Sequence, residues 1–342
     1  MSTADAVGAV LWVGATLYAV FAGADFGAGF WSFFAGRGER AERARDQVDH
    51  SIGPVWEANH VWLIFILVVL WTAFSEAFAA VFSTLFIPLS LAALGIVLRG
   101  TGFAFHRLAP SDRERRWYQA LFGAASILTP FFMGTVIGAI ASGRVPLGNA
   151  EGDAVSSWLN GVSLLTGALF VATGVYLAAV FLVSDSRRAG DEDLVQYFTA
   201  RAMGAAVVAG AIAVAGIFVY HAEARYIYDG LVDEGLPIVI FSAICGAGAL
   251  FLLWRGASRG VRELAVGAVV AVVWAWGVAQ YPYLLPESLT VNEGAADHET
   301  LVETLIVFGA AVLLVIPSLV LLYVLTQRDI VAEEHEPIAG RE

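Results

Sequence analysis

Nine long and continuously apolar segments divide the chain, and they constrain its fold more than any other feature. They occupy residues 6–34, 52–74, 77–98, 117–142, 157–184, 202–221, 236–254, 262–285 and 304–326. A helix that crosses a bilayer needs about 20 predominantly apolar residues. Transmembrane barrel strands instead alternate apolar and polar residues over about ten positions. The segments therefore predict an all-α polytopic membrane protein with about nine transmembrane helices.

The composition of the chain agrees with a membrane protein and excludes other classes. Hydrophobic residues make up 58% and charged residues 15% of the sequence, whereas a soluble domain has roughly 45–50% apolar and about 25% charged residues. A net charge of −12 argues against nucleic acid as a partner. The single cysteine, Cys245, rules out an intramolecular disulfide and any site built from several cysteines.

The arginines predict how the chain lies in the membrane. All 19 basic residues are arginine. If the N-terminus lies outside, every arginine except Arg144 and Arg225 falls on the inner side of the membrane. Inner loops of membrane proteins carry this excess of positive charge. We therefore expect a multi-pass protein of the cell membrane, with its N-terminus outside and its C-terminus in the cytoplasm.

A faint internal repeat suggests how the helices are grouped. The stretch 17–25 and the stretch 177–185 share five of nine residues. Duplication and chance similarity between Ala/Val/Leu-rich helices explain this equally well. Duplication would give two four-helix bundles plus one peripheral helix. The predicted units are residues 1–142, which hold an acidic cluster, residues 143–285, and residues 286–342 with the last outer loop, the ninth helix and a cytoplasmic tail.

One carboxylate lies within the first apolar segment. Asp25 stands in the stretch Gly-Ala-Asp-Phe-Gly-Ala-Gly, which covers residues 23–29. An ionisable side chain in a bilayer costs roughly 2.5–3.5 kcal/mol on insertion scales, so it is a functional candidate by default. Gly23 and Gly27 form a small-xxx-small pair that lets a second helix approach closely. We therefore expect Asp25 to face protein rather than lipid.

A second group of polar residues opens the next segment. Glu57 and His60 are three residues apart and so share a helical face. Asn59 lies between them, and Trp56 and Trp62 flank the group as interfacial anchors or packing residues.

The expected depths bring these residues together. At a rise of 1.5 Å per residue, Asp25 lies about 13 Å and Glu57 about 8 Å from the inner boundary. Arg99 and His106 flank the inner end of the third segment. Such a cluster of titratable groups, open to the cytoplasm, suits proton transfer. It also suits a structural role, in which Asp25 bonds a neighbouring helix and Glu57 caps its helix or pairs with Arg99.

These residues carry a resemblance to a known family. Residues 23–29 and the stretch Ser-Ile-Gly-Pro-Val-Trp-Glu-Ala-Asn-His-Val-Trp-Leu at 51–63 resemble the N-terminal signature of cytochrome bd oxidase subunit II. Residues 99–106 are similar to the end of its third helix, and residues 281–289 to its last outer loop. The segment Trp-Glu-Ala-Asn-His-Val-Trp is the most specific of these marks.

The resemblance implies a heterodimer in which a partner, subunit I, carries haem b, haem d and the quinol-binding loop. The complex would oxidise quinol, reduce O₂ to water and take its protons from the cytoplasm. Subunit II would support subunit I without a redox centre or metal of its own. Asp25 and Glu57 match family positions that are thought to lie on the proton path. The resemblance leaves room for a structural quinone, bound lipids and small single-helix accessory subunits.

Two departures from the family pattern limit that path. Some members carry a further acid where this chain has Ala22, and many carry one where it has Ala104. His106 is a candidate substitute. Two other readings stay open at this point: a proton-coupled transporter, whose site would lie nearer the membrane midplane, and a scaffold subunit that performs no chemistry.

Overall fold

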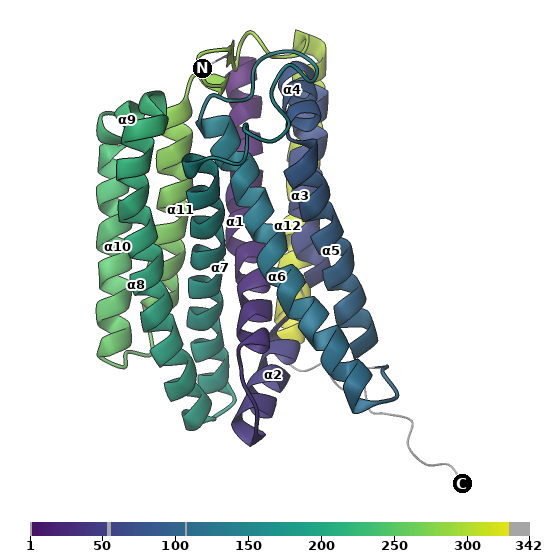
Figure 1. Ribbon diagram of the computed structural model, residues 1–342, viewed down its shortest axis with the longest axis vertical. Coiled ribbons are helices and arrows are strands. Elements are labelled where there is room, and N and C mark those ends of the chain that lie inside the picture. Colours follow the sequence, from purple (N-terminus) through teal and green to yellow (C-terminus); the bar gives the residue numbers. More distant parts are fainter. Residues whose placement is uncertain (1, 53–55, 107, 328–342) are drawn as a thin grey trace.

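The computed structural model describes residues 2–52, 56–106 and 108–327 and is almost entirely helical (Figure 1). The long helices are α1 (Thr3–Phe33), α3 (Trp56–Ala73), α5 (Phe86–His106), α6 (Asp112–Ala141), α7 (Gly161–Arg188), α8 (Glu192–Glu223), α10 (Leu236–Trp254), α11 (Val261–Gln280) and α12 (His298–Gln327). The short helices are α2 (Glu39–Ile52), α4 (Ser75–Thr84) and α9 (Arg225–Val232).

The helices confirm a polytopic membrane protein. Within the described residues, 8 helices are long and apolar enough to cross a membrane, or up to 9 if the bent pair α3–α4 counts as one span. The helices run alternately up and down, so that α2 and the α7–α8 and α10–α11 turns lie at one end (Figure 1). That end carries most of the arginines, and we call it the arginine-rich end.

Two predicted segments were wrong at their borders. The segment 77–98 was expected to be one helix, but residues 75–84 form α4, which turns by 118° from α3, and the third span begins at Phe86. The segment 262–285 was too long because α11 ends at Gln280. Residues 283–285 are strand β1 (Tyr283–Leu285), which pairs antiparallel with β2 (Leu289–Thr290).

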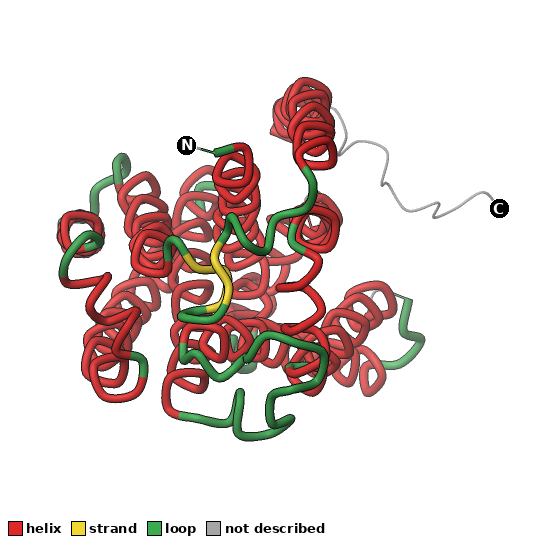
Figure 2. Tube along the Cα trace, turned by 90° about the horizontal axis from the view of Figure 1, so that it is seen from above, coloured by secondary structure: helices red, strands yellow, loops and turns green. Residues whose placement is uncertain are grey.

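Helix α1 lies at the centre of the bundle. It packs along α7 and also contacts α3, α6, α11 and α12. The view from above shows α12 at the edge of the molecule and the β1–β2 hairpin lying across the end of the bundle (Figure 2). Two side-chain hydrogen bonds join the start of α1 to the residues that flank this hairpin. Ser2 donates to Asn292 at 2.7 Å, and Tyr281 donates to Asp5 at 3.3 Å. The division into units at residues 142 and 285 stays a prediction.

Glycines explain how closely the two central helices approach. A methyl group on Gly27 of α1 would overlap the backbone of Gly174 on α7, while one on Gly23 would only touch it. Small residues at such positions allow helix backbones to come together in membranes. Asp25 stands two residues from each glycine and so lies on the opposite side of α1, where it faces α5. It faces protein as expected, but its partner helix is not the one that the glycines contact.

Candidate functional site

A buried ion pair joins the first and third long helices. Nη2 of Arg99 on α5 lies 2.7 Å from Oδ1 of Asp25 on α1, and each side chain is only 2% exposed. The same nitrogen donates a longer bond, 3.3 Å, to the backbone oxygen of Asp25. An ion pair that lies out of water is stable only if its geometry is good and its remaining groups are bonded.

Helix α6 also contacts Arg99. Its Nε donates to the hydroxyl of Ser126 on α6 at 3.0 Å, and that hydroxyl donates to the Phe122 carbonyl at 2.7 Å. The rings of Phe26 and Phe122 each lie 4.9 Å from the guanidinium carbon. Aromatic faces attract such a cation and exclude water from it. The third glycine of the motif, Gly29, leaves the space that Ser126 fills.

The second oxygen of Asp25 is the exception in this bonded cluster. Oδ2 of Asp25 is buried and has no hydrogen-bond partner among the described residues. A buried carboxylate oxygen normally has a partner, and each exception calls for an explanation. The ion pair thus leaves one acceptor available to a proton or a water molecule inside the membrane span.

Three residues of the second polar group, Asn59, His60 and Trp62, contact the part of α1 that carries Asp25. Asn59 is buried and its side chain reaches toward the Phe21 carbonyl at 3.5 Å. The ring of His60 lies edge-on to Phe26, with centroids 6.2 Å apart. Trp62 packs against the group formed by Tyr18, Ala22 and Phe26. The side chains of Trp56 and Glu57 lie outside the described part of the structure, so their predicted roles are not placed.

His106 has a partner that sequence reasoning missed. Its Nε2 lies 2.9 Å from Oδ2 of Asp49 on α2, and its Nδ1 lies 2.8 Å from the Phe103 carbonyl. The histidine is buried, whereas 27% of the Asp49 side chain is exposed. The pair therefore joins a buried side chain of the bundle to a carboxylate that water reaches at the arginine-rich end. The sequence offers no signal for Asp49 beyond its place among the charged residues of the polar helix α2.

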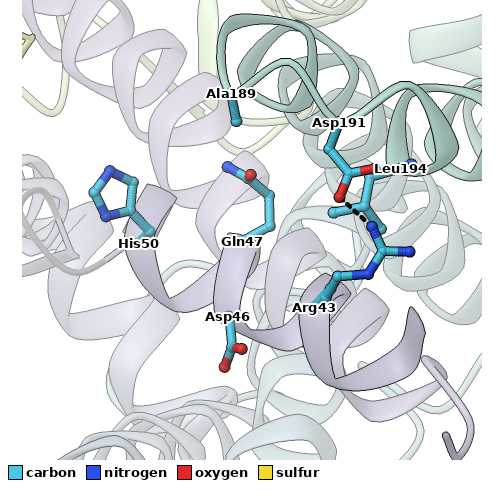
Figure 3. Close-up of a pocket in the computed structure, with 7 residues that line it drawn as sticks. All are labelled: Arg43, Asp46, Gln47, His50, Ala189, Asp191 and Leu194. Atoms are coloured by element: carbon cyan, nitrogen blue, oxygen red, sulfur yellow. Dashed lines mark hydrogen bonds and ion pairs between the residues drawn. The ribbon is translucent and has the colours of Figure 1, made fainter. Parts of the chain in front are cut away.

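Helix α2 is also tied to the α7–α8 turn. Arg43 binds both Asp191 and Asp193, and Ser51 donates to Asp185 at 2.9 Å. The backbone N–H of Leu194 and then the guanidinium of Arg43 lower the pKa of Asp191 below its ordinary value. Figure 3 shows Arg43 reaching across to Asp191. The hollow between them has a volume of about 420 Å³ and is lined by Arg43, Asp46, Gln47, His50, Ala189, Asp191 and Leu194.

The described residues contain no group of three or more His, Cys, Asp or Glu side chains that could hold a metal ion. Both ring nitrogens of His106 are engaged by Asp49 and Phe103.

Comparison with known proteins decides the family. The family model for cytochrome bd terminal oxidase subunit II matches residues 4–326. The chain belongs to this family. It is 25% identical over 333 residues to a putative cytochrome bd menaquinol oxidase subunit II of Bacillus subtilis, with 94% of each chain covered. It is 25% identical over 309 residues to the cytochrome bd-I ubiquinol oxidase subunit 2 of Escherichia coli, covering 80% of this chain and 79% of the relative.

A solved structure agrees with the family. A chain of the bd oxidase from Geobacillus thermodenitrificans superposes with a TM-score of 0.74 at 26% identity, and the match covers 94% of this chain and 98% of that one. Membership of the family confirms the resemblance that residues 23–29 and 51–63 carry. The chain is subunit II of a quinol-oxidising terminal oxidase, and family membership implies a subunit I partner that holds the haems. It also disfavours the proton-coupled transporter.

Proposed function

We propose that this subunit II supports the haem-bearing subunit I and passes protons from the cytoplasm through the site at Asp25 and Arg99. The observation that carries the proposal is the Asp25 carboxylate, which is buried in a span, ion-paired through Oδ1 to Arg99, and without a bonding partner on Oδ2 among the described residues. O₂ reduction to water consumes protons, so the complex needs polar groups that lead them into the membrane.

The depth of the site fits proton uptake from one side. Asp25 stands eight residues before the end of α1, which is about 12 Å at 1.5 Å per residue. Its half of the membrane is the one next to the arginine-rich end. The positive-inside rule makes that end cytoplasmic, so we place the N-terminus of this cell-membrane protein outside and its C-terminal end in the cytoplasm.

The His106–Asp49 pair extends the polar residues toward the cytoplasm. His106 follows Arg99 by seven residues on α5, so both occupy one face two helical turns apart. Asp49 is the partly exposed member of the pair. We therefore place proton entry at Asp49 and His106 and the deeper acceptor at Asp25. Glu57 and His60 stay on the candidate path through the family resemblance.

Membership of the family indicates that the complex oxidises a quinol, but it does not identify which quinone the complex uses. One relative is named a menaquinol oxidase subunit and another a ubiquinol oxidase subunit. We assign quinol as the reductant of the whole complex, with haem b and haem d in subunit I. A structural quinone, accessory single-helix subunits and bound lipids complete the proposed assembly.

A purely structural role is the rival account of the same ion pair. Arg99 links α1, α5 and α6, so it stabilises the bundle whether or not protons pass. Removing only Asp25 leaves a buried unpaired charge, which typically costs about 3–5 kcal/mol. A single neutral variant would therefore slow turnover under both accounts.

The deciding experiment removes both charges together. The variant Asp25→Asn/Arg99→Gln leaves neither charge without a partner. Quinol-dependent O₂ consumption and the haem absorption spectrum of the purified complex are measured against wild type. The proposal expects normal haem content with turnover lowered by about tenfold or more, within the range that positioned proton-transfer groups contribute. Wild-type turnover in the double variant would contradict the proton path and leave the scaffold role.

A matched control tests whether the position of the charges matters. Asp229→Asn/Arg225→Gln removes an ion pair of 3.0 Å at the opposite end of the molecule, where both side chains are about half exposed. This variant is expected to keep wild-type turnover.

A further inference from the structure

The turn between α10 and α11 holds a group of arginines that form no ion pair with carboxylates of the described residues, although Glu263 stands in the same first turn of α11 as Arg262. The turn covers residues 255–260 and carries Arg255 and Arg259, and Arg262 follows in the first turn of α11. Arg187, in the last turn of α7, donates to the Ala257 carbonyl at 3.1 Å and so belongs to the same group. We call these four residues the α10–α11 arginine group.

Within the described residues, none of these four arginines forms an ion pair, although the chain as a whole has a net charge of −12. Some of the other arginines at the same end are matched, whereas no ion pair is formed among the described residues by Arg37, Arg45, Arg113, Arg116 or Arg201. Arg43 pairs with Asp191 and Asp193, and Arg188 lies 3.6 Å from Asp185. The α10–α11 arginine group differs from the other arginines without an ion pair in that side chains from two helix ends and the turn between α10 and α11 meet at one place.

Aromatic side chains place the group at the level of the membrane surface. The guanidinium carbon of Arg262 lies 4.1 Å from the centre of the Phe181 ring, and that of Arg255 lies 5.6 Å from the centre of the Phe251 ring. Phe251 is 54% exposed and Trp254 is 70% exposed at the end of a transmembrane helix. Exposed tryptophan at a helix end is typical of the boundary between hydrocarbon and headgroups.

We infer that the α10–α11 arginine group binds the phosphate of an anionic phospholipid in the leaflet at the arginine-rich end. Guanidinium groups bind phosphate oxygens through paired N–H donors. The rings of Phe181 and Phe251 contact the guanidinium groups of Arg262 and Arg255 through their faces, which does not use the N–H donors. Trp254 and Phe251 offer the adjoining apolar surface to an acyl chain. Clusters of arginine directly beside transmembrane helices are the usual basis of such lipid recognition.

The test uses the purified oxidase complex and phosphatidylglycerol as the probe. Native mass spectrometry counts the lipids retained, and thermal unfolding in detergent measures the stabilisation that added lipid gives. Wild type is expected to retain phosphatidylglycerol and to be stabilised by it. In Arg187→Gln/Arg262→Gln the apparent affinity should fall by about tenfold or more, since each surface arginine contributes to anionic-lipid binding. The pair Arg255→Gln/Arg259→Gln, whose side chains are more exposed, gives a second test if the first variant fails to assemble.

Two matched comparisons make the outcome decisive. Arg144→Gln/Arg225→Gln removes the two arginines of the opposite end and should bind phosphatidylglycerol as wild type does. Phosphatidylcholine and inorganic phosphate should stabilise the complex much less than phosphatidylglycerol. The inference is overturned if the group variants bind phosphatidylglycerol unchanged, if phosphatidylcholine acts equally well, or if inorganic phosphate alone reproduces the effect.

Discussion

Gly27 of α1 lies so close to Gly174 of α7 that a methyl group on Gly27 would overlap the Gly174 carbonyl. The contact fixes how α1 is rotated, and thereby which face of the bundle receives Asp25. Gly27→Ala forces two backbones apart, so we expect it to lower the free energy of unfolding by about 3 kcal/mol, the upper part of the range for overpacking. Thermal unfolding of the purified complex measures this.

Gly204→Ala on α8 is the matched control for this substitution. It also adds a methyl group to a glycine inside a long helix, but nothing lies within 4 Å of the added atom. Alanine is the better helix former by roughly 1 kcal/mol in a helix interior. Stability should therefore be unchanged or higher. Equal losses in the two variants would contradict the close contact between α1 and α7.

The ion pair should behave as a unit when its members are removed. Arg99→Gln leaves the Asp25 carboxylate buried and unpaired, which we expect to cost about 3–5 kcal/mol. Asp25→Asn/Arg99→Gln removes both charges, and neutral replacement of a buried pair often costs little. The double variant should therefore assemble better than the single one. The amount of haem-loaded complex recovered from membranes measures this, and equal losses in both would count against the pairing.

The spans were predictable because each one is a local property of the sequence. An apolar run of about 20 residues crosses the membrane whatever its neighbours do, and the cost of an ionisable group in lipid already indicated that Asp25 faces protein. The bend before α4 was not predictable in this way. Residues 75–84 are as apolar as a span, and Phe74, where the chain turns, is neither glycine nor proline.

The partners of the polar residues depend on how the helices are arranged in space. Sequence reasoning put Arg99 near two carboxylates, and only the packing of α5 on α1 and α6 joins it to Asp25 and Ser126. Asp49 is one of several charged residues in α2, and its partner His106 stands 57 residues further along the chain. Nothing in the local pattern distinguishes Asp49 from Asp46.

The link between α2 and the α7–α8 turn should weaken in acid. The Leu194 N–H and Arg43 lower the pKa of Asp191 from its ordinary value of 3.8. A group whose pKa is lower in the folded state stabilises the fold above its unfolded pKa, and that contribution is lost as the pH falls through the folded value. We expect faster backbone hydrogen exchange in α2 once the pH drops below about 4. In Asp191→Asn, exchange in α2 should already be fast at neutral pH, after correction for the intrinsic pH dependence of exchange.

Asp49 offers a test of proton entry that is separate from the buried ion pair. Its carboxylate holds His106 at 2.9 Å and is partly exposed, so it is the first acid of the proposed path to meet water. Asp49→Asn keeps the shape and a hydrogen bond but cannot take up a proton. We expect O₂ consumption at saturating quinol to fall by about tenfold, at the lower edge of what a positioned proton-transfer group contributes.

Rescue separates this role from a structural one. Asp49→Glu restores a carboxylate with a longer side chain, so it should recover much of the lost turnover. Asp46→Asn removes an exposed acid one helical turn earlier on α2 and should leave turnover unchanged. If Asp49→Asn and Asp49→Glu were equally slow, the loss would come from altered packing of α2 on α5. If Asp49→Asn turned over like wild type, protons would have to enter by another route.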